Sequence, residues 1–326
     1  MNQKMDSGAS NFPGGARFAF TILDDTDDST LENVRPVYDR LHELGFRTTK
    51  TVWPLDCPEG SRHFFAADTL ERPDYLEWVR ELVGAGFDLG LHGATMESSQ
   101  RERTESGLLR LEREFGGIPR VYANHGFNRE NLYWGAERFR TPWLRYLFSR
   151  LGTQGEGFFV GQKPESEYFW GDLCEQHIEY VRGFTFAGLN VRRYDRHTPY
   201  HLPDTPYVRF WFSTADAPDV ETFKQRVTTA ALDELEAEGG ICILSTHLGK
   251  GFARNGRLDP MIDEILRGLA ERPGWFVPVA EILDYVRSER DSDVILSAAE
   301  SRRLELRFCR FKLQERLEGL LASRLR

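Results

Sequence analysis

The sequence lacks the features of disulfide-rich, zinc-finger and membrane proteins. Its four cysteines, Cys57, Cys174, Cys242 and Cys309, form no C-x-x-C pair, which excludes the usual thiolate zinc modules and gives no disulfide framework. No apolar run approaches the length of a transmembrane helix, and residues 1–15 contain no apolar core of a signal peptide. Internal repeats and low-complexity segments are missing as well. These absences predict a soluble, reduced, cytoplasmic protein.

Basic residues are outnumbered by acidic ones. The chain has 42 Lys and Arg residues against 51 Asp and Glu residues, and a net charge of −9 argues against a nucleic-acid-binding protein. From Arg287 to the end there are 10 basic and 7 acidic side chains, so this segment carries +3 and the preceding part −12. Hydrophobic residues make up 40% and aromatics 13%, enough for a sizeable core in one large domain or two ordinary ones.

Short apolar runs alternate with amphipathic segments along most of the chain. We expect strands over residues 17–23, 46–53, 87–93, 120–126, 240–247 and 275–279. We expect helices over residues 29–45, 74–86, 101–116, 135–152, 258–274 and 280–290. In the first helix Ser29 and Glu32 have capping-box spacing, and Pro36 predicts a kink or a restarted helix. The alternation predicts a parallel sheet with covering helices.

Two stretches depart from this alternation. Residues 155–219 are rich in aromatics, prolines and histidines, and they predict long loops with two or three strands inserted in the same domain. The last thirty-odd residues predict an amphipathic helix, whose apolar positions would be buried against the body, a second copy or another protein. These positions include Leu304, Phe308, Phe311, Leu317 and Leu321.

Metal-competent side chains stand at the ends of four of the predicted strands: Asp24 and Asp25, His92, His125, and His247. Because the carboxyl ends of parallel strands share one face, these side chains should converge. A lone histidine at a strand end is more often a structural residue, but convergence of Asp25 with the three histidines favours a divalent cation. The cation would also relieve the repulsion within the acidic run that begins at Asp24.

The acidic run itself has two further members, Asp27 and Asp28. Because acidic residues favour the first turn of a helix, we expect these two to form a turn and a helix N-cap rather than to bind the cation.

Four motifs resemble those of the polysaccharide deacetylase family, the NodB-like carbohydrate esterases. TILDDT resembles the family's T-F-D-D-G, LHGATM its H-[S/T]-x-x-H, and ILSTH its late apolar strand and histidine, while ANHG stands where the family has R-x-P-x-G. The resemblance covers about residues 15 to 287. It implies an α/β fold, a distorted (β/α)7-type barrel over residues 16–287 with an aromatic-rich insert. Residues 1–15 would be a flexible N-terminus and residues 288–326 an appended C-terminal helix.

The resemblance also implies metal-dependent removal of an acetyl group from an N-acetylated sugar. By this likeness Asp24 is the catalytic base and His247 the catalytic acid. Asp25 and His92 are ligands of a divalent metal, for which zinc is the expected ion. A cytoplasmic protein would act on a nucleotide- or lipid-linked precursor of a surface polysaccharide.

The third metal ligand departs from the family pattern. Met96 stands where the family has its second histidine, and a thioether is a poor zinc ligand beside oxygen and nitrogen donors. Either His125 or Glu97 would replace it.

The aromatic-rich stretch supplies candidates for substrate binding. Trp170 and Trp211 would stack on sugar rings, Asp172 would bond hydroxyl groups, and Lys250 would bind an anionic group. The alternative is that these rings only pack the insert on the barrel.

Two other functions stay open. A barrel without a working site would serve as a sugar-binding or scaffold protein, which Met96 and the missing arginine motif favour. A metal-independent glycosidase would pair Asp24 with Glu97 or Asp216. The C-terminal helix would allow a homo-oligomer in either case.

Overall fold

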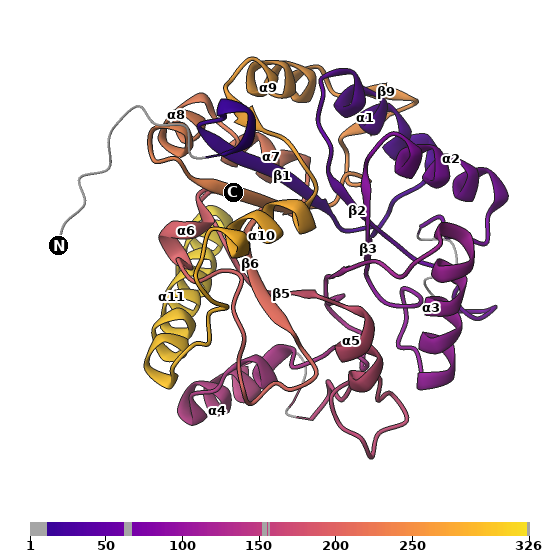
Figure 1. Ribbon diagram of the computed structural model, residues 1–326, viewed down its shortest axis with the longest axis vertical. Coiled ribbons are helices and arrows are strands. Elements are labelled where there is room, and N and C mark those ends of the chain that lie inside the picture. The colour runs from indigo at the N-terminus through magenta and orange to yellow at the C-terminus, as the bar shows by residue number, and fades with distance from the viewer. Residues whose placement is uncertain (1–11, 62–66, 152–154, 156, 325–326) are drawn as a thin grey trace.

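Seven parallel strands form a closed barrel (Figure 1). The computed structural model describes residues 12–61, 67–151, 155 and 157–324, so most of the predicted flexible N-terminus lies outside the described residues. The barrel strands are β1 (Phe18–Asp24), β2 (Thr49–Val52), β3 (Asp88–Leu91), β4 (Val121–Tyr122), β5 (Tyr180–Phe186), β6 (Phe210–Asp216) and β7 (Ile241–Thr246). They pair in chain order, and β7 pairs back to β1.

The barrel is distorted at β1. A short strand, β10 (Gly274–Trp275), pairs with Phe18 and Ala19 at the start of β1, whereas β2 pairs with Leu23 and Asp24 at its end. The two partners therefore share one side of β1. The predicted distorted (β/α)7-type barrel is confirmed.

Helices surround the barrel (Figure 1). They are α1 (Leu31–Glu43), α2 (Pro73–Gly84), α3 (Arg101–Phe115), α4 (Pro142–Leu151), α5 (Gly171–His177), α6 (Val191–Tyr194), α7 (Val220–Arg226), α8 (Thr229–Ala237), α9 (Pro260–Ala270), α10 (Val279–Ser288) and α11 (Ala298–Arg324). Two 3-10 turns, η1 (Pro13–Gly15) and η2 (Gly135–Arg138), and a small hairpin of β8 (Ala253–Arg254) and β9 (Arg257–Leu258) complete the chain. The capping box of α1 is formed by Thr30 and Asn33, one residue later than predicted, and the helix continues through Pro36.

The pleat of β1 separates two cores. Phe18, Phe20 and Ile22 pack in the large cluster beneath the outer helices, whereas Ala19 and Leu23 belong to the cluster inside the barrel. Successive side chains of a strand point to opposite faces. Asp24, the last residue of β1, and Asp25, the residue after it, therefore point to different sides of the barrel wall.

The aromatic-rich stretch contributes two of the barrel strands. β5 pairs in parallel with β4 and with β6, and β6 pairs in parallel with β7. The prediction of two or three strands here is confirmed, but they are not an insert, because both strands are part of the wall of the barrel itself.

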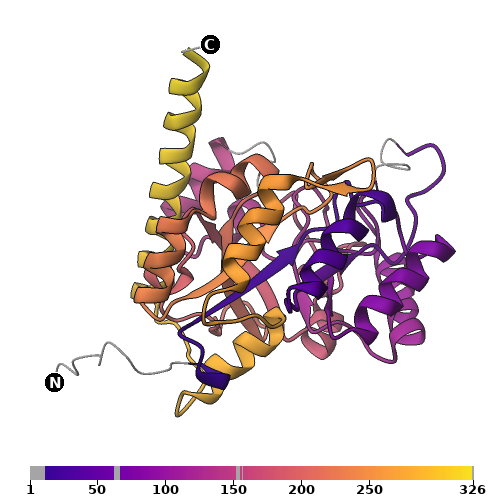
Figure 2. The ribbon, with the colours of Figure 1, turned by 90° about the horizontal axis from the view of Figure 1, so that it is seen from above.

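The two ends of the barrel differ. Apolar residues of α10, among them Val279 and Leu283, pack inside the barrel with Ala19, and the backbone N–H of Val279 donates to Thr49 at the start of β2. Helix α10 therefore covers the end where the strands begin. Figure 2 shows α10 at this end and α11 extending beyond the opposite end.

The first half of α11 packs on the barrel. Leu304 and Phe308 are buried, and buried Glu305 accepts hydrogen bonds from the backbone N–H groups of Arg140 and Thr141. The side chains of Leu317 and Leu321 lie outside the described part of the chain. No described helix is both long and apolar enough to cross a membrane.

Candidate metal centre

Three histidines point their Nε2 atoms at one carboxylate, that of Asp27. The distances are 3.4 Å from His92, 3.5 Å from His125 and 3.4 Å from His247. The histidines follow β3, β4 and β7, and Asp27 follows β1, so the carboxyl ends of four barrel strands supply the cluster. The predicted convergence of His92, His125 and His247 is therefore present in the structure, with Asp27 at its centre.

Hydrogen bonds define the protonation of each imidazole. Nδ1 of His92 lies 2.7 Å from the carbonyl oxygen of Ala123, and Nδ1 of His247 lies 2.7 Å from that of Pro218. A carbonyl oxygen can only accept, so both Nδ1 atoms carry a proton. In a neutral imidazole the Nε2 atom then presents a lone pair, and both lone pairs face Asp27.

His125 is oriented by a side-chain network rather than by a carbonyl group. Its Nδ1 lies 2.9 Å from Oδ1 of Asn128, whose Nδ2 donates to Oε1 of Glu130 at 2.9 Å and to the carbonyl oxygen of Thr95 at 3.1 Å. These acceptors assign the orientation of the Asn128 amide, so Nδ1 of His125 is the donor. Its Nε2 lone pair therefore also faces Asp27.

Lone pairs that face a carboxylate repel it unless protons or a cation lie between them. Burial alone would lower the pKa of His125 and of His247, but the Asp27 carboxylate outweighs it and raises both values. Burial would raise the pKa of Asp27, yet the three imidazoles, when protonated at Nε2, hold it well below its usual range. Oδ1 of Asp27 is buried and accepts no hydrogen bond from any described residue. A divalent cation fits this donor set of one carboxylate and neutral imidazoles.

The ligand atoms closest to one another belong to Asp27, His92 and His125, all within 4.8 Å. The indole of Trp53 packs against both imidazoles, with ring centroids 5.0 Å from His92 and 5.2 Å from His125. His247 lies outside this compact group. The group contains His125 and not Glu97, the two residues that the sequence offered as the third ligand.

The Asp25 carboxylate is bound by an arginine. Nη1 of Arg182, in β5, lies 2.8 Å from Oδ1 and 2.6 Å from Oδ2 of Asp25, and also contacts the Ser245 hydroxyl. Burial would raise the pKa of Asp25, but the charges of Arg182, His92 and His247 hold it below its usual range. The nearest imidazole nitrogen, Nδ1 of His92, is 4.0 Å away. The structure thus places Asp25 beside the cluster rather than within it.

The Asp24 carboxylate lies outside the barrel and forms a buried ion pair. Its Oδ2 accepts from Nζ of Lys50 at 2.9 Å and from the Tyr38 hydroxyl at 2.9 Å, and its Oδ1 accepts from the backbone N–H of Leu248 at 2.8 Å. Burial would lower the pKa of Lys50, but the charge of Asp24 outweighs it and raises the value. Asp24, predicted as the catalytic base, therefore does not face the histidines, because the pleat of β1 turns it to the helix layer.

A tight turn brings Asp27 to the histidines. Asp28 has a left-handed backbone conformation with φ of 58°. The loop after β7 packs against this turn at Gly249, where a Cβ atom would lie 2.6 Å from the Asp28 carbonyl group. Nδ2 of Asn33 donates hydrogen bonds to the backbone carbonyl oxygens of both segments, at 2.9 Å to Asp28 and 3.2 Å to Gly249. The turn predicted for Asp27 and Asp28 is present, but it directs Asp27 inward. The predicted N-cap is wrong, because Thr30 caps α1.

Three of the predicted substrate-binding residues, Trp170, Trp211 and Asp172, have partners within the protein. Trp170 and Trp211 are buried, and their indole N–H groups donate to the Glu130 carbonyl oxygen at 2.7 Å and the Thr205 hydroxyl at 2.9 Å. Asp172 forms an ion pair with Arg101 on α3.

Two other side chains flank the cluster. Lys250 is partly exposed, and its Nζ lies 3.8 Å from Asp28 Oδ2. Phe127, which the sequence did not single out, is 61% exposed, and its ring centroid lies 6.1 Å from that of His125.

No protein-family model matches the sequence, and no curated protein matches it. Solved structures match the fold. A protein of Mycobacterium smegmatis assigned as a polysaccharide deacetylase is 15% identical, with a TM-score of 0.50 over 90% of this chain and 99% of that chain. A similarly assigned protein of Pseudomonas aeruginosa PAO1 is 13% identical, with a TM-score of 0.51 over 86% of this chain and 95% of that chain. The chain therefore has the fold of the NodB-like polysaccharide deacetylases, the family that its sequence motifs resemble.

Proposed function

We propose that this protein is a metal-dependent deacetylase that hydrolyses the amide of an N-acetylated sugar. The observation that carries the proposal is the meeting of three imidazole Nε2 atoms at the Asp27 carboxylate, at the end of the barrel where the strands finish. In barrels of this kind active sites are built at that end. Asp27, His92 and His125 would hold the ion, for which zinc fits the ligand types.

The roles of the acidic residues in this proposal differ from those that the motif resemblance implies. Asp27 replaces Asp25 as the metal ligand, and Asp25 replaces Asp24 as the base. The support for this change is the ion pair of Asp24 with Lys50 outside the barrel and the position of Asp25 beside the cluster. His247 keeps the role of the acid, and His125 rather than Glu97 is the third ligand.

Amide hydrolysis needs one proton acceptor and one proton donor. When bound, the ion would polarise the acetyl carbonyl and lower the pKa of water. Asp25, ionised because Arg182 holds its pKa low, would take the proton of the water that attacks the acetyl carbon. The carbon–nitrogen bond then breaks, and His247 would give its proton to the departing sugar nitrogen. The raised pKa of His247 favours a proton donor at neutral pH.

The substrate we propose is a sugar that carries an anionic group. The exposed ring of Phe127 beside His125 would stack on the apolar face of a pyranose. The charge of Lys250 acts on His247, where it opposes the rise in pKa that the carboxylates cause, so Lys250 lies near the site. It would bind a phosphate or carboxylate. A nucleotide- or lipid-linked N-acetyl sugar of the cytoplasm meets both requirements.

The direct test is acetate release. Metal-free protein is incubated with nucleotide-linked N-acetyl sugars, with and without added zinc, and acetate is quantified. The proposal predicts zinc-dependent acetate release by the natural protein and none by the Asp27→Asn variant. Absence of acetate release with every nucleotide- and lipid-linked N-acetyl sugar would contradict it.

A further inference from the structure

The outer face of α11 carries arginines that have no partner among the described residues. Arg302, Arg303 and Arg310 are exposed, and none of them forms a hydrogen bond or ion pair with a described residue. Their spacing places them on one side of the helix, opposite the buried Leu304 and Phe308. Such a row of arginines in an acidic protein is positioned to meet a negatively charged surface.

The charge of the chain is unevenly divided. Residues 302–326 carry eight basic and three acidic side chains, a net charge of +5, so the remaining residues carry −14 of the total of −9. The part of α11 beyond the packed residues extends past the end of the barrel where the strands finish (Figure 2). Only the later part of this basic segment therefore projects at the same end as the candidate metal centre, while Arg302, Arg303 and Arg310 lie on the part that packs on the barrel.

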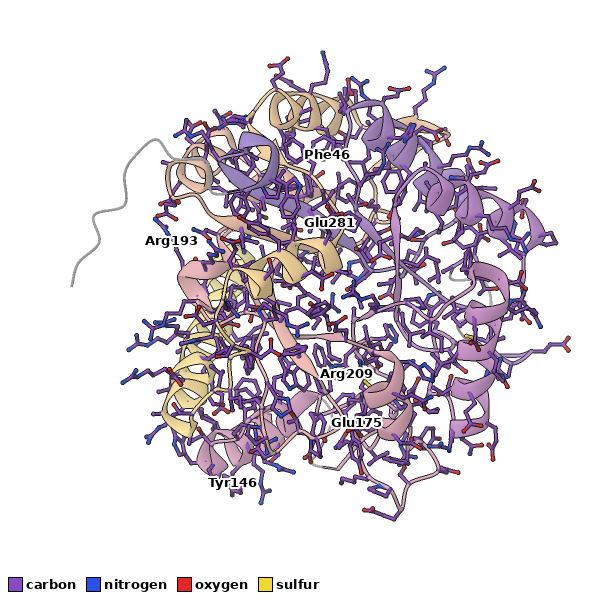
Figure 3. All side chains as sticks on the ribbon, in the orientation of Figure 1. Phe46, Tyr146, Glu175, Arg193, Arg209 and Glu281 are labelled. Carbon is purple, nitrogen blue, oxygen red and sulfur yellow. The ribbon has the colours of Figure 1, made fainter. Side chains whose placement is uncertain are left out.

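Helix α4 exposes apolar side chains next to α11. Trp143, Tyr146 and Leu147 are 50%, 62% and 43% exposed, and their spacing puts them on one helix face. Figure 3 shows Tyr146 at the edge of the molecule. The two helices are in contact, because the rings of Phe148 in α4 and Phe308 in α11 lie 6.2 Å apart. We call the six residues Trp143, Tyr146, Leu147, Arg302, Arg303 and Arg310 the α4–α11 surface.

This combination is typical of helices that lie in a membrane interface. Trp and Tyr are enriched at the headgroup level, and arginines near the surface are attracted to anionic lipids. A symmetric dimer through α11 would instead set one row of arginines against its copy. No described helix can span a bilayer, so the contact would be peripheral.

We infer that the α4–α11 surface docks the protein on an anionic lipid bilayer. The apolar side chains of α4 enter the headgroup region, and the arginines of α11 bind the lipid phosphates. If the proposed function holds, docking brings the metal centre to a substrate carried on a lipid; the docking itself does not depend on that function.

The test is sedimentation of the full chain with vesicles of phosphatidylcholine, alone or mixed with phosphatidylglycerol. The inference predicts binding only to the mixed vesicles, weakened by salt. The triple variant Arg302→Gln/Arg303→Gln/Arg310→Gln should bind about 100-fold more weakly, at roughly fivefold per arginine. The matched control Arg254→Gln/Arg257→Gln/Arg267→Gln removes the same charge near α9 and should bind like the natural protein.

A second variant tests the apolar half of the surface. Trp143→Ser/Leu147→Ser should reduce binding to the mixed vesicles, while circular dichroism shows an unchanged fold. The inference is overturned if the natural protein does not sediment with phosphatidylglycerol, or if both triple variants lose binding equally. It is also overturned if light scattering shows a dimer that the α11 variant abolishes and vesicles bind nothing, because α11 would then contact a second copy.

Activity on a soluble acetylated substrate separates this inference from the proposed function. The α4–α11 variants should release acetate from a nucleotide-linked sugar at the natural rate. Vesicle binding without acetate release by any protein would leave the docking intact and contradict only the proposed deacetylase.

Discussion

Nη1 of Arg182 lies 2.8 and 2.6 Å from the two carboxylate oxygens of Asp25, and this contact joins the end of β1 to the middle of β5 across the barrel. The arginine neutralises Asp25 without any metal. Among the described residues, the charged partners of Asp27, two residues later, are the three imidazoles. The two carboxylates of one short segment therefore have different partners and, in our account, different roles.

Replacement of Arg182 should move the pH profile of catalysis. Arg182 lowers the pKa of Asp25, so Arg182→Gln should raise that pKa. The acidic limb of kcat/KM, below which the base is protonated, should then shift to higher pH. The profile is measured as initial rates of acetate release over a pH series. Arg302→Gln, on the outer face of α11, should leave the limb in place, and an unshifted limb in Arg182→Gln would argue against Asp25 as the base.

Loss of the Asp24–Lys50 pair should affect stability rather than chemistry. Lys50→Met leaves a buried carboxylate with one partner fewer, and breaking a buried pair costs about 3–5 kcal/mol of the free energy of unfolding. Urea denaturation measures this loss. The double variant Asp24→Leu/Lys50→Met removes both charges and should recover part of it. If Asp24 were the catalytic base, the folded double variant would release no acetate, whereas we expect it to retain activity.

His247 should be required for turnover but not for metal binding. His247→Gln removes the proposed proton donor and should lower kcat by about 10²- to 10⁴-fold. The zinc affinity of this variant, measured by calorimetry, should stay close to that of the natural protein, because His247 lies outside the compact ligand group. His92→Gln is the comparison and should lose affinity. A loss of zinc by His247→Gln as large as that by His92→Gln would make His247 a fourth ligand.

The buried Asp195 should make stability depend on pH. Burial raises its pKa to about 6, although the Ser213 hydroxyl donates to it at 2.7 Å. Because the folded-state pKa lies above the unfolded value of 3.8, the contribution of Asp195 is complete below about pH 4 and is lost as the pH rises through 6. With about 2 pKa units at ~1.4 kcal/mol each, the loss approaches ~3 kcal/mol.

The Asp195→Asn variant isolates this effect from that of other titrating groups. Urea denaturation of both proteins from pH 4 to pH 7.5 should show the variant gaining stability relative to the natural protein as the pH rises. A constant difference across this range would mean that Asp195 titrates normally.

Much of the fold and half of the site follow from the sequence. The alternation of apolar and amphipathic segments predicted a parallel sheet with covering helices, and the motif resemblance implied the barrel. The strand-end rule found His92, His125 and His247. The sequence pattern did not show which of the aspartates faces the histidines. In the structure Phe18, Phe20 and Ile22 pack beneath the outer helices, and continuing that period assigns Asp24 to the helix layer.

Other features depend on contacts that no local pattern reports. Asp27 reaches the histidines because of a left-handed residue and the approach of Gly249 from more than two hundred residues away. Arg182 and Lys50 carried a usable signal, since a cation inside an apolar strand needs a partner. Arg182 was missed because its stretch, rich in aromatics and prolines, predicted loops. The same composition made Trp170 and Trp211 resemble sugar-binding residues, whereas both rings fill the core.

The central claim, that Asp27 and not Asp25 holds the metal, is tested by the metal content of two matched variants. Asp25→Asn and Asp27→Asn each remove one negative charge from the same short segment, and each protein is loaded with zinc, dialysed and analysed by elemental mass spectrometry. If Asp27 is the ligand, we expect one zinc per chain in Asp25→Asn, with acetate release reduced, and no retained zinc in Asp27→Asn. Retained zinc in Asp27→Asn together with its loss from Asp25→Asn would contradict it.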